Sequence, residues 1–283
     1  MSREQQDPAG RRHVIYTDID GTFLDARTYS DAASRPALEQ ALRRGVCVVF
    51  CSSKTGAEIR RLADALGFRH PYIAENGGGI YVPDRFFETS LEEFPQESGY
   101  RVMRLGTGYA DLVRALHEVR DELGLALRGF SDMTPAEVAD RCGFALDEAR
   151  LAVARRFDEP FVAEPADAAA VARISEAFVR RGLQVTRGGR FFHITGRNDK
   201  GIAVTRLNER FCREESGIVT YGLGDSANDI PLLSSVDHAY LVQKPDGRFD
   251  PKVCDELPEI IKVPGIGPAA WGQVVHALVR DLG

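Results

Sequence analysis

The chain has 283 residues, a length that predicts one or two domains. Hydrophobic residues make up 43% of it and charged residues 28%, which is typical of globular proteins and excludes disordered and fibrous classes. Its 36 basic and 42 acidic residues give a net charge of −6, so the composition favours neither nucleic acid nor an anionic membrane surface as a partner. No apolar segment approaches the roughly 18 residues of a transmembrane helix.

The first twelve residues and the cysteines indicate where the protein is located. Residues 1–12 are polar and lack the apolar segment of a secretory signal, so we expect a flexible N-terminal tail. The five cysteines are scattered and include no Cys-x-x-Cys pair, which argues against a structural zinc site. This use of cysteine is typical of a reducing compartment, and we expect a cytoplasmic protein.

The first 83 residues alternate between short apolar segments, which predict buried strands, and amphipathic segments, which predict helices. A capping-box pattern from Thr55 to Glu58 marks the start of the second helix, and Gly67 marks its end. The expected order is strand 13–17, helix 34–44, strand 46–51, helix 55–66 and strand 72–74. Strands that alternate with helices indicate a parallel sheet and therefore an α/β fold.

This alternation stops after Pro83 and resumes near residue 197. Residues 84–105 have no clear periodicity, and the segments after them predict helices 110–123, 135–141, 147–156 and 168–181 and a hairpin at 185–194. The alternation then resumes with helix 199–209, strand 218–223, helix 228–235, strand 238–242 and helix 271–282. The sequence thus predicts an α/β core of residues 13–83 and 197–283, interrupted by an α+β insertion of residues 84–196.

The strongest functional pattern is Asp18-Ile19-Asp20-Gly21-Thr22, at the carboxyl end of the first predicted strand. Ligands of open parallel sheets bind at that edge. Two adjacent carboxylates repel each other unless one is protonated or a cation bridges them, and Mg²⁺ suits a site that also holds phosphate. The same residues are typical of a turn or a calcium loop. The calcium loop is excluded because its twelfth position, which requires Glu, is Tyr29.

Three further segments fit the same edge of the sheet. The run from Gly224 to Asp229 follows another predicted strand, although Ser, Asn and Asp are also ordinary helix caps. Ser52 follows the second strand, where its hydroxyl and nearby amides can bind phosphate. Lys200 begins a helix, and its simpler interpretation is a solvated side chain. A cation in the first turn is slightly unfavourable to the helix dipole, which argues for a specific role.

In order along the chain, four patterns resemble the motifs of the haloacid dehalogenase-like (HAD) hydrolase superfamily: Asp18-x-Asp20-Gly-Thr, Ser52, Lys200 and Gly224-Asp225-x-x-Asn228-Asp229. Smaller signatures are similar to those of its mannosyl-3-phosphoglycerate phosphatase family: Ser52-Ser-Lys-Thr55, Glu75-Asn-Gly-Gly78, Asp158-Glu-Pro-Phe161, Gly189-Arg-Phe-Phe-His193 and Gly267-Pro-x-x-Trp271. The resemblance spans about residues 13–282. It implies a Rossmann-like core with an inserted C2-type (C2B) cap that governs substrate specificity.

The resemblance also implies a Mg²⁺-dependent phosphatase that works through an aspartyl phosphate. Asp18 would be the nucleophile, and Asp20 would be the general acid and base. The residues expected to hold the metal are Asp18, Asp20 through its backbone carbonyl, and Asp225, with Asn228 and Asp229 behind them. Two residues would hold the transferring phosphoryl group, namely Ser52 and Lys200.

Substrate recognition is expected from the insertion and from the core loops beside it. Arg190 suits a glycerate carboxylate, Glu159 suits sugar hydroxyls, and Lys54 would add positive charge from the core side. The simpler interpretation of these residues is an ordinary ion pair, and for His193 it is a hydrogen-bonded histidine within a strand. The expected substrate-binding residues are Lys54, Asn76, Glu159, Arg190 and His193.

Three functional hypotheses follow for this chain, which we expect to be a monomer or a homodimer. The first is hydrolysis of a small sugar-phosphate ester, 2-O-(α-D-mannosyl)-3-phosphoglycerate, to the compatible solute mannosylglycerate, with the glucosyl ester or another sugar phosphate as a variant. The second is a phosphomannomutase, which would return the phosphate to a hydroxyl group and not to water. The third is a non-catalytic binding module, against which the complete set of carboxylates and Lys200 argues.

Overall fold

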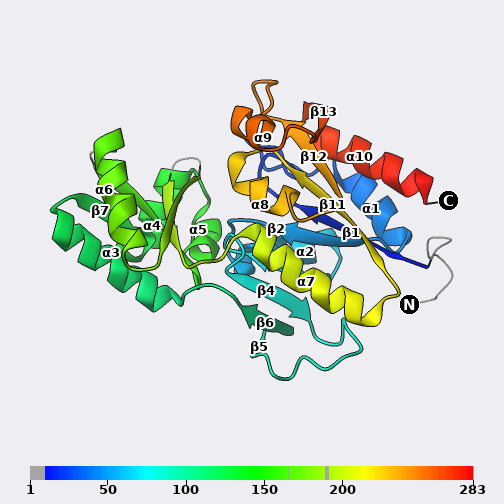
Figure 1. Cartoon of the computed structure of the whole chain (residues 1–283), viewed down its shortest axis with the longest axis horizontal. Coiled ribbons are helices and arrows are strands. Elements are labelled where there is room, and N and C mark those ends of the chain that lie inside the picture. The colour runs from blue at the N-terminus through cyan, green and yellow to red at the C-terminus, as the bar shows by residue number, and fades with distance from the viewer. Residues whose placement is uncertain (1–9, 165, 189–190, 283) are drawn as a thin grey trace.

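The computed structural model describes residues 10–164, 166–188 and 191–282. Figure 1 shows a larger lobe, which contains both β1 and α10, and a smaller lobe drawn in green, which lies to one side of it. Residues 1–9 of the expected tail lie outside the described residues. None of the described helices is both long enough and apolar enough to cross a membrane.

A nine-stranded sheet forms the centre of the larger lobe within the described residues. Its strand order is β13 (Ile261–Ile266), β12 (His238–Gln243), β11 (Ile218–Gly224), β1 (Arg12–Thr17), β2 (Cys47–Cys51), β3 (Tyr72–Ala74), β4 (Gly79–Pro83), β6 (Tyr100–Arg104) and β5 (Gln96–Glu97). Neighbouring strands from β13 to β3 are parallel, and the pairs that involve β4, β5 and β6 are antiparallel. The predicted α/β fold with a parallel sheet is therefore confirmed.

Helices cover both faces of this sheet because successive strand residues point to opposite sides. Ile15 of β1 packs in one apolar cluster with Leu38 and Trp271, while its neighbour Tyr16 packs in another with Leu207. The helices of the first face are α1 (Arg35–Arg43), α2 (Gly56–Leu66) and α10 (Pro268–Asp281). Those of the second face are α7 (Lys200–Glu214), α8 (Ile230–Leu233), which follows the 3₁₀ turn η2 (Ala227–Asp229), and α9 (Pro251–Glu256).

The smaller lobe contains a four-stranded antiparallel sheet. Its strand order is β7 (Ala126–Gly129), β8 (Asp158–Glu164), β10 (Phe191–Thr195) and β9 (Gln184–Gly188). Phe161 and Phe192 of this sheet share an apolar cluster with residues of helices α3 (Tyr109–Leu123) and α6 (Ala168–Val179). The remaining helical elements of the lobe are η1 (Phe130–Asp132), α4 (Pro135–Cys142) and α5 (Leu146–Ala152).

Residues 84–105, which show no clear periodicity in the sequence, contain two strands of the larger sheet. Strands β5 and β6 lie within the segment predicted to be irregular, yet β6 pairs along its whole length with β4 of the larger sheet. Tyr100 and Val102 are buried there among core residues. Local periodicity missed this pairing because two and five residues are too few to show a pattern, and the partner strand supplies the stabilisation.

Candidate active site

The carboxyl ends of β1 and β11 bring two acidic segments together. The backbone N–H of Asp18 donates to the carbonyl of Leu223 at 2.9 Å, so the two strand ends are in register. Gly21 turns the chain away with a φ of +83°, and a Cβ on Gly21 would lie only 2.9 Å from Oδ2 of Asp225. Glycine is required here for both reasons, since only it adopts this conformation freely and admits the carboxylate.

Lys200 lies at the centre of this acidic site. Its Nζ donates to Oδ1 of Asp18 at 2.7 Å and to Oδ1 of Asp229 at 2.6 Å, and the residue is only 1% exposed. Asp199 caps α7 by accepting a hydrogen bond from Ile202, which places Lys200 in the first turn. A buried ammonium group in the first turn interacts unfavourably with the helix dipole. The two carboxylates offset this cost by pairing with the ammonium group. Lys200 thus lies between Asp18 and Asp229, and its role in binding phosphate stays a prediction.

Three carboxylates of this site fit a divalent cation. Oxygens of Asp18, Asp225 and Asp229 lie within 4.8 Å of one another, and all three residues are buried. Burial, reinforced by Asp229 and Asp225, raises the pKa of Asp18 well above its usual value despite the Lys200 charge. Burial, followed by repulsion from Asp229, raises the pKa of Asp225 to about 7. A set of oxygen ligands with excess negative charge has the chemistry that Mg²⁺ prefers.

Asp229 also organises the backbone beside the metal site. Its Oδ2 accepts from the backbone N–H of Asp225 at 3.1 Å and of Ser226 at 3.2 Å. Asn228 accepts a hydrogen bond from the Ser226 hydroxyl at 2.6 Å and lines the same cavity as Asp225. Asp229 thus links Lys200 to the loop that carries Asp225.

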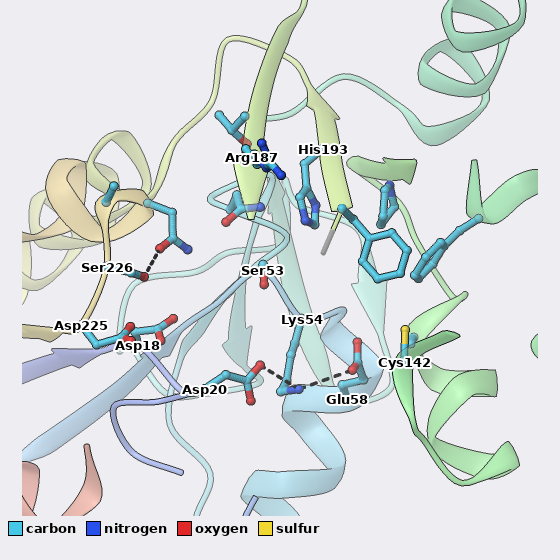
Figure 2. Close-up of a pocket in the computed structure, with 18 of the residues that line it drawn as sticks. Asp18, Asp20, Ser53, Lys54, Glu58, Cys142, Arg187, His193, Asp225 and Ser226 are labelled. Atoms are coloured by element: carbon cyan, nitrogen blue, oxygen red, sulfur yellow. Dashed lines mark hydrogen bonds and ion pairs between the residues drawn. The ribbon is translucent and has the colours of Figure 1, made fainter. Parts of the chain in front are cut away.

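Asp20 and Lys54 form a second ion pair beside Asp18. Their Oδ2 and Nζ atoms are 3.0 Å apart, and Lys54 is also 3.8 Å from Glu58 (Figure 2). Burial lowers the pKa of Lys54, but Asp20 and Glu58 outweigh burial and hold this pKa above its usual value. Ser52 is 1% exposed, and its hydroxyl accepts from the backbone N–H of Lys54 at 3.2 Å.

A cavity of about 500 Å³ joins this core site to the smaller lobe. Figure 2 shows Arg187 and His193 on strands of the smaller lobe, opposite Asp18, Asp225 and Lys54 of the core. Aromatic side chains form part of the cavity wall, namely Tyr29, Phe130, Phe144 and Phe191. The two lobes also touch directly, since Arg155 donates to the carbonyl of Ser53 at 2.7 Å and the Thr55 hydroxyl donates to that of Leu151 at 2.9 Å.

The loop of residues 75–78 lies where the chain crosses between the lobes. Glu75 accepts hydrogen bonds from the backbone N–H groups of Arg156 at 2.9 Å and Phe157 at 2.7 Å, just before β8. Gly77 has a φ of +86°, and a Cβ there would lie 2.0 Å from the carbonyl oxygen of Asp199. The loop therefore packs against both the segment that enters β8 and the segment that leads to Lys200.

Three of the predicted substrate-binding residues need comment. Glu159 is fully buried and does not line the cavity, because it faces the opposite side of β8, where its Oε1 accepts two hydrogen bonds from Ser131. Asn76 does line the cavity, but its Nδ2 donates to Asp158 at 2.8 Å. Arg190 lies outside the described residues. Lys54 and His193 line the cavity, and their role in substrate binding stays a prediction.

Sequence reasoning missed several charged residues of the cavity wall, including Arg155, Arg187 and Lys244. Arg187 lies on the predicted hairpin, but strand alternation could not have identified it, because it pairs with Phe192 and not with His193. Its guanidinium lies 5.4 Å from the centroid of the Phe192 ring. Arg155 follows α5 outside any strand or helix, and no local pattern indicates its role. Ser53, and not Ser52, contributes to the wall.

The fold and the acidic site together define a HAD-like hydrolase. The family model described as haloacid dehalogenase-like hydrolase matches residues 15–98. A solved Thermoplasma acidophilum structure superposes with a TM-score of 0.68 at 18% identity, covering 96% of this chain and 100% of that one. A phosphatase structure from Bacteroides thetaiotaomicron gives 0.65 at 19% identity, covering 96% and 97%.

Curated relatives narrow the family further. The chain is 40% identical over 95% of its length to a glucosyl-3-phosphoglycerate/mannosyl-3-phosphoglycerate phosphatase of Methanococcoides burtonii, covering 97% of that protein. It is 33% identical to a protein of the same name from Persephonella marina, covering 95% of this chain and 98% of that one. A mannosyl-3-phosphoglycerate phosphatase of Pyrococcus furiosus is 31% identical, with coverage of 81% and 90%. The chain belongs to this family of HAD-like phosphatases, which confirms the resemblance found in the sequence.

Proposed function

We propose that this chain hydrolyses 2-O-(α-D-mannosyl)-3-phosphoglycerate to mannosylglycerate and phosphate, with the glucosyl ester as a close variant. The observation that carries the proposal is the cavity that joins Asp18, Asp20 and Asp225 to Arg187 and His193. Its volume of about 500 Å³ suits a small organic ligand. The names of the relatives, which include both sugars, support the same substrate class.

The core residues have the chemistry for a two-step displacement. A carboxylate oxygen of Asp18 attacks phosphorus, the bond from phosphorus to the glycerate oxygen breaks, and Asp20 gives that oxygen its proton. Water then attacks the phosphorus of the aspartyl phosphate while Asp20 accepts a proton from it, which releases phosphate and restores Asp18. Lys200 holds Asp18 in place, and with Ser52 it would stabilise the transferring phosphoryl group.

Mg²⁺ is the cofactor that we propose for this site. Asp18 and Asp225 would hold it through carboxylate oxygens and Asp20 through its backbone carbonyl, while Asp229 and Asn228 support the loop. When bound, the cation reduces the repulsion between the anionic nucleophile and the phosphate ester.

We propose that the smaller lobe is a C2-type cap of the C2B class. The proposed cap spans about residues 106–197, since β5 and β6 belong to the larger sheet. Its contacts with the core around Ser53 and Thr55 would exclude water during the first step. We also propose a cytoplasmic location, which the scattered cysteines and the lack of a Cys-x-x-Cys pair favour.

Phosphate release tests this function directly. The substrates are mannosyl-3-phosphoglycerate, glucosyl-3-phosphoglycerate, mannose 6-phosphate and 3-phosphoglycerate, each measured with Mg²⁺ and with EDTA. We expect metal-dependent release with a preference for the glycosyl phosphoglycerates. Equal weak activity on all four would contradict the proposed specificity, and a requirement for a sugar bisphosphate would indicate a mutase.

A further inference from the structure

Asp158 is a buried carboxylate without a part in the chemistry described above. It is 0% exposed, and both of its oxygens contact Nδ1 of His193, at 2.9 and 3.1 Å. Burial alone would raise the pKa of Asp158, but His193, Arg155 and Asn76 outweigh burial and hold this pKa below its usual value. The carboxylate is therefore ionised and only accepts hydrogen bonds.

The register of the smaller sheet brings Asp158 and His193 together. His193 of β10 is paired with Pro160 of β8 and with Thr186 of β9, and all three line the cavity. Asp158 lies two residues before Pro160 on the same face of β8, so it is a diagonal neighbour of His193. The contact between them therefore holds the imidazole ring at the cavity wall.

We propose that Asp158 is a positioning residue, which holds His193 with the proton on Nδ1 so that Nε2 accepts a hydrogen bond from a sugar hydroxyl. The hydrogen-bond geometry requires a proton on Nδ1, because an ionised carboxylate only accepts, and a neutral ring then has its acceptor at Nε2. The identity of the ligand rests on the proposed function. Arg155 and Arg187 in the same wall only donate, so His193 supplies an acceptor that sugar hydroxyls need.

Asn76 connects this pair to the core. It follows β3, and its Nδ2 donates to Oδ2 of Asp158 at 2.8 Å across the boundary between the lobes. The carboxylate that orients His193 is thus itself fixed by a core residue. The proposed recognition of the sugar by His193 therefore depends on how the smaller lobe is positioned relative to the core.

A double-substitution cycle tests whether Asp158 acts through His193. For mannosyl-3-phosphoglycerate, Asp158→Asn is expected to raise KM about tenfold, with kcat changed less than about threefold. In a His193→Gln background the same substitution is expected to change KM less than about twofold, because the residue that it positions is gone. A tenfold rise in both backgrounds would overturn the proposal. Asp237→Asn is the matched control, since Asp237 accepts hydrogen bonds from Thr220 outside the cavity.

Nitrogen-15 NMR of labelled histidine gives a readout that needs no substrate. The spectrum of the wild-type protein is expected to show the His193 proton on Nδ1 and a lone pair on Nε2, and Asp158→Asn is expected to remove that preference. A ring with the proton on Nε2, or on both nitrogens, would overturn the proposal even if the variant failed to fold. If the wild-type protein releases no phosphate from glycosyl phosphoglycerates, the proposed function fails, while the NMR spectrum still decides the tautomer.

Discussion

The two walls of the cavity are built on sheets of different kinds. In the core, Asp18 and Asp225 lie at the carboxyl ends of adjacent parallel strands, where the topology makes their side chains converge. In the smaller lobe, His193 lies within an antiparallel strand, and alternation decides whether a residue faces the cavity or the helices. A shift of one residue separates Pro160, at the cavity, from Glu159, behind it. Topology thus fixes the groups that we propose to react, and strand register fixes the groups that we propose to select the substrate.

Asp18→Asn tests the core wall with the largest expected effect. The amide has nearly the same size but is a poor nucleophile, so kcat is expected to fall at least about 10⁴-fold for every phosphate ester. Phosphate release measures the loss, and thermal unfolding checks that the variant folds. Activity within about tenfold of wild type would contradict the proposed nucleophile.

Lys200→Met tests the buried charges of the core. It leaves Asp18 and Asp229 without their ammonium partner, and a broken buried ion pair costs about 3–5 kcal/mol of unfolding free energy. Lys252→Met is the control, because Lys252 pairs with Glu256 at an exposed site and should cost less than about 1 kcal/mol. Urea denaturation compares the two variants, and similar losses would contradict the argument.

Gly77→Ala tests the connection between the two walls. The new Cβ would meet the carbonyl of Asp199 at 2.0 Å, and the backbone there has positive φ. We expect a loss of about 3 kcal/mol in unfolding free energy, together with lower kcat, because the segment before Lys200 must move. Gly67→Ala also has positive φ but no neighbour within 4 Å, and should cost about 1 kcal/mol with normal kcat. Urea unfolding and phosphate release distinguish the two substitutions.

The buried carboxyl group of Glu75, in the loop of residues 75–78, is expected to make the stability of the protein depend on pH. Burial raises the pKa of Glu75 from 4.5 to about 7, despite Arg155 and two backbone N–H donors. The unfolded chain releases this proton near pH 4.5 and the folded chain near pH 7, so stability falls as the pH rises between these values. The loss attributable to Glu75 is on the order of 3 kcal/mol.

Glu75→Gln is expected to remove that part of the slope. Unfolding free energies from urea denaturation at several pH values, in the absence of metal, measure it. Glu39→Gln alters an exposed glutamate of α1 and should leave the slope unchanged. Equal slopes in the wild type and in Glu75→Gln would contradict this origin.

Arg187→Gln tests the wall in the smaller lobe and has the smallest expected effect. The loss of one charged hydrogen-bond donor is expected to raise KM for mannosyl-3-phosphoglycerate about tenfold, with little change in kcat. Arg150→Gln is the control, since Arg150 is exposed on α5 and pairs with Asp147 away from the cavity. A large fall in kcat with unchanged KM would place Arg187 among the reacting groups. It would contradict the proposal that the smaller lobe contributes to substrate binding and not to the chemical step.

The sequence by itself predicted the parallel strands β1, β2, β3, β11 and β12 and the candidate residues Asp18, Asp225 and Lys200, because buried strands and the polar residues that follow them are local patterns. It did not predict β13, the parallel strand at the edge of the sheet. Tertiary structure decided which distant groups meet. Lys200 and Asp18 are 182 residues apart, and Arg155, which no local pattern marks, reaches the cavity through packing between the lobes. The pairing of β8 with β10 decided that Glu159 faces away from the cavity and that Asp158 contacts His193. Register and contacts between lobes depend on the burial of whole faces, which no short window of sequence encodes.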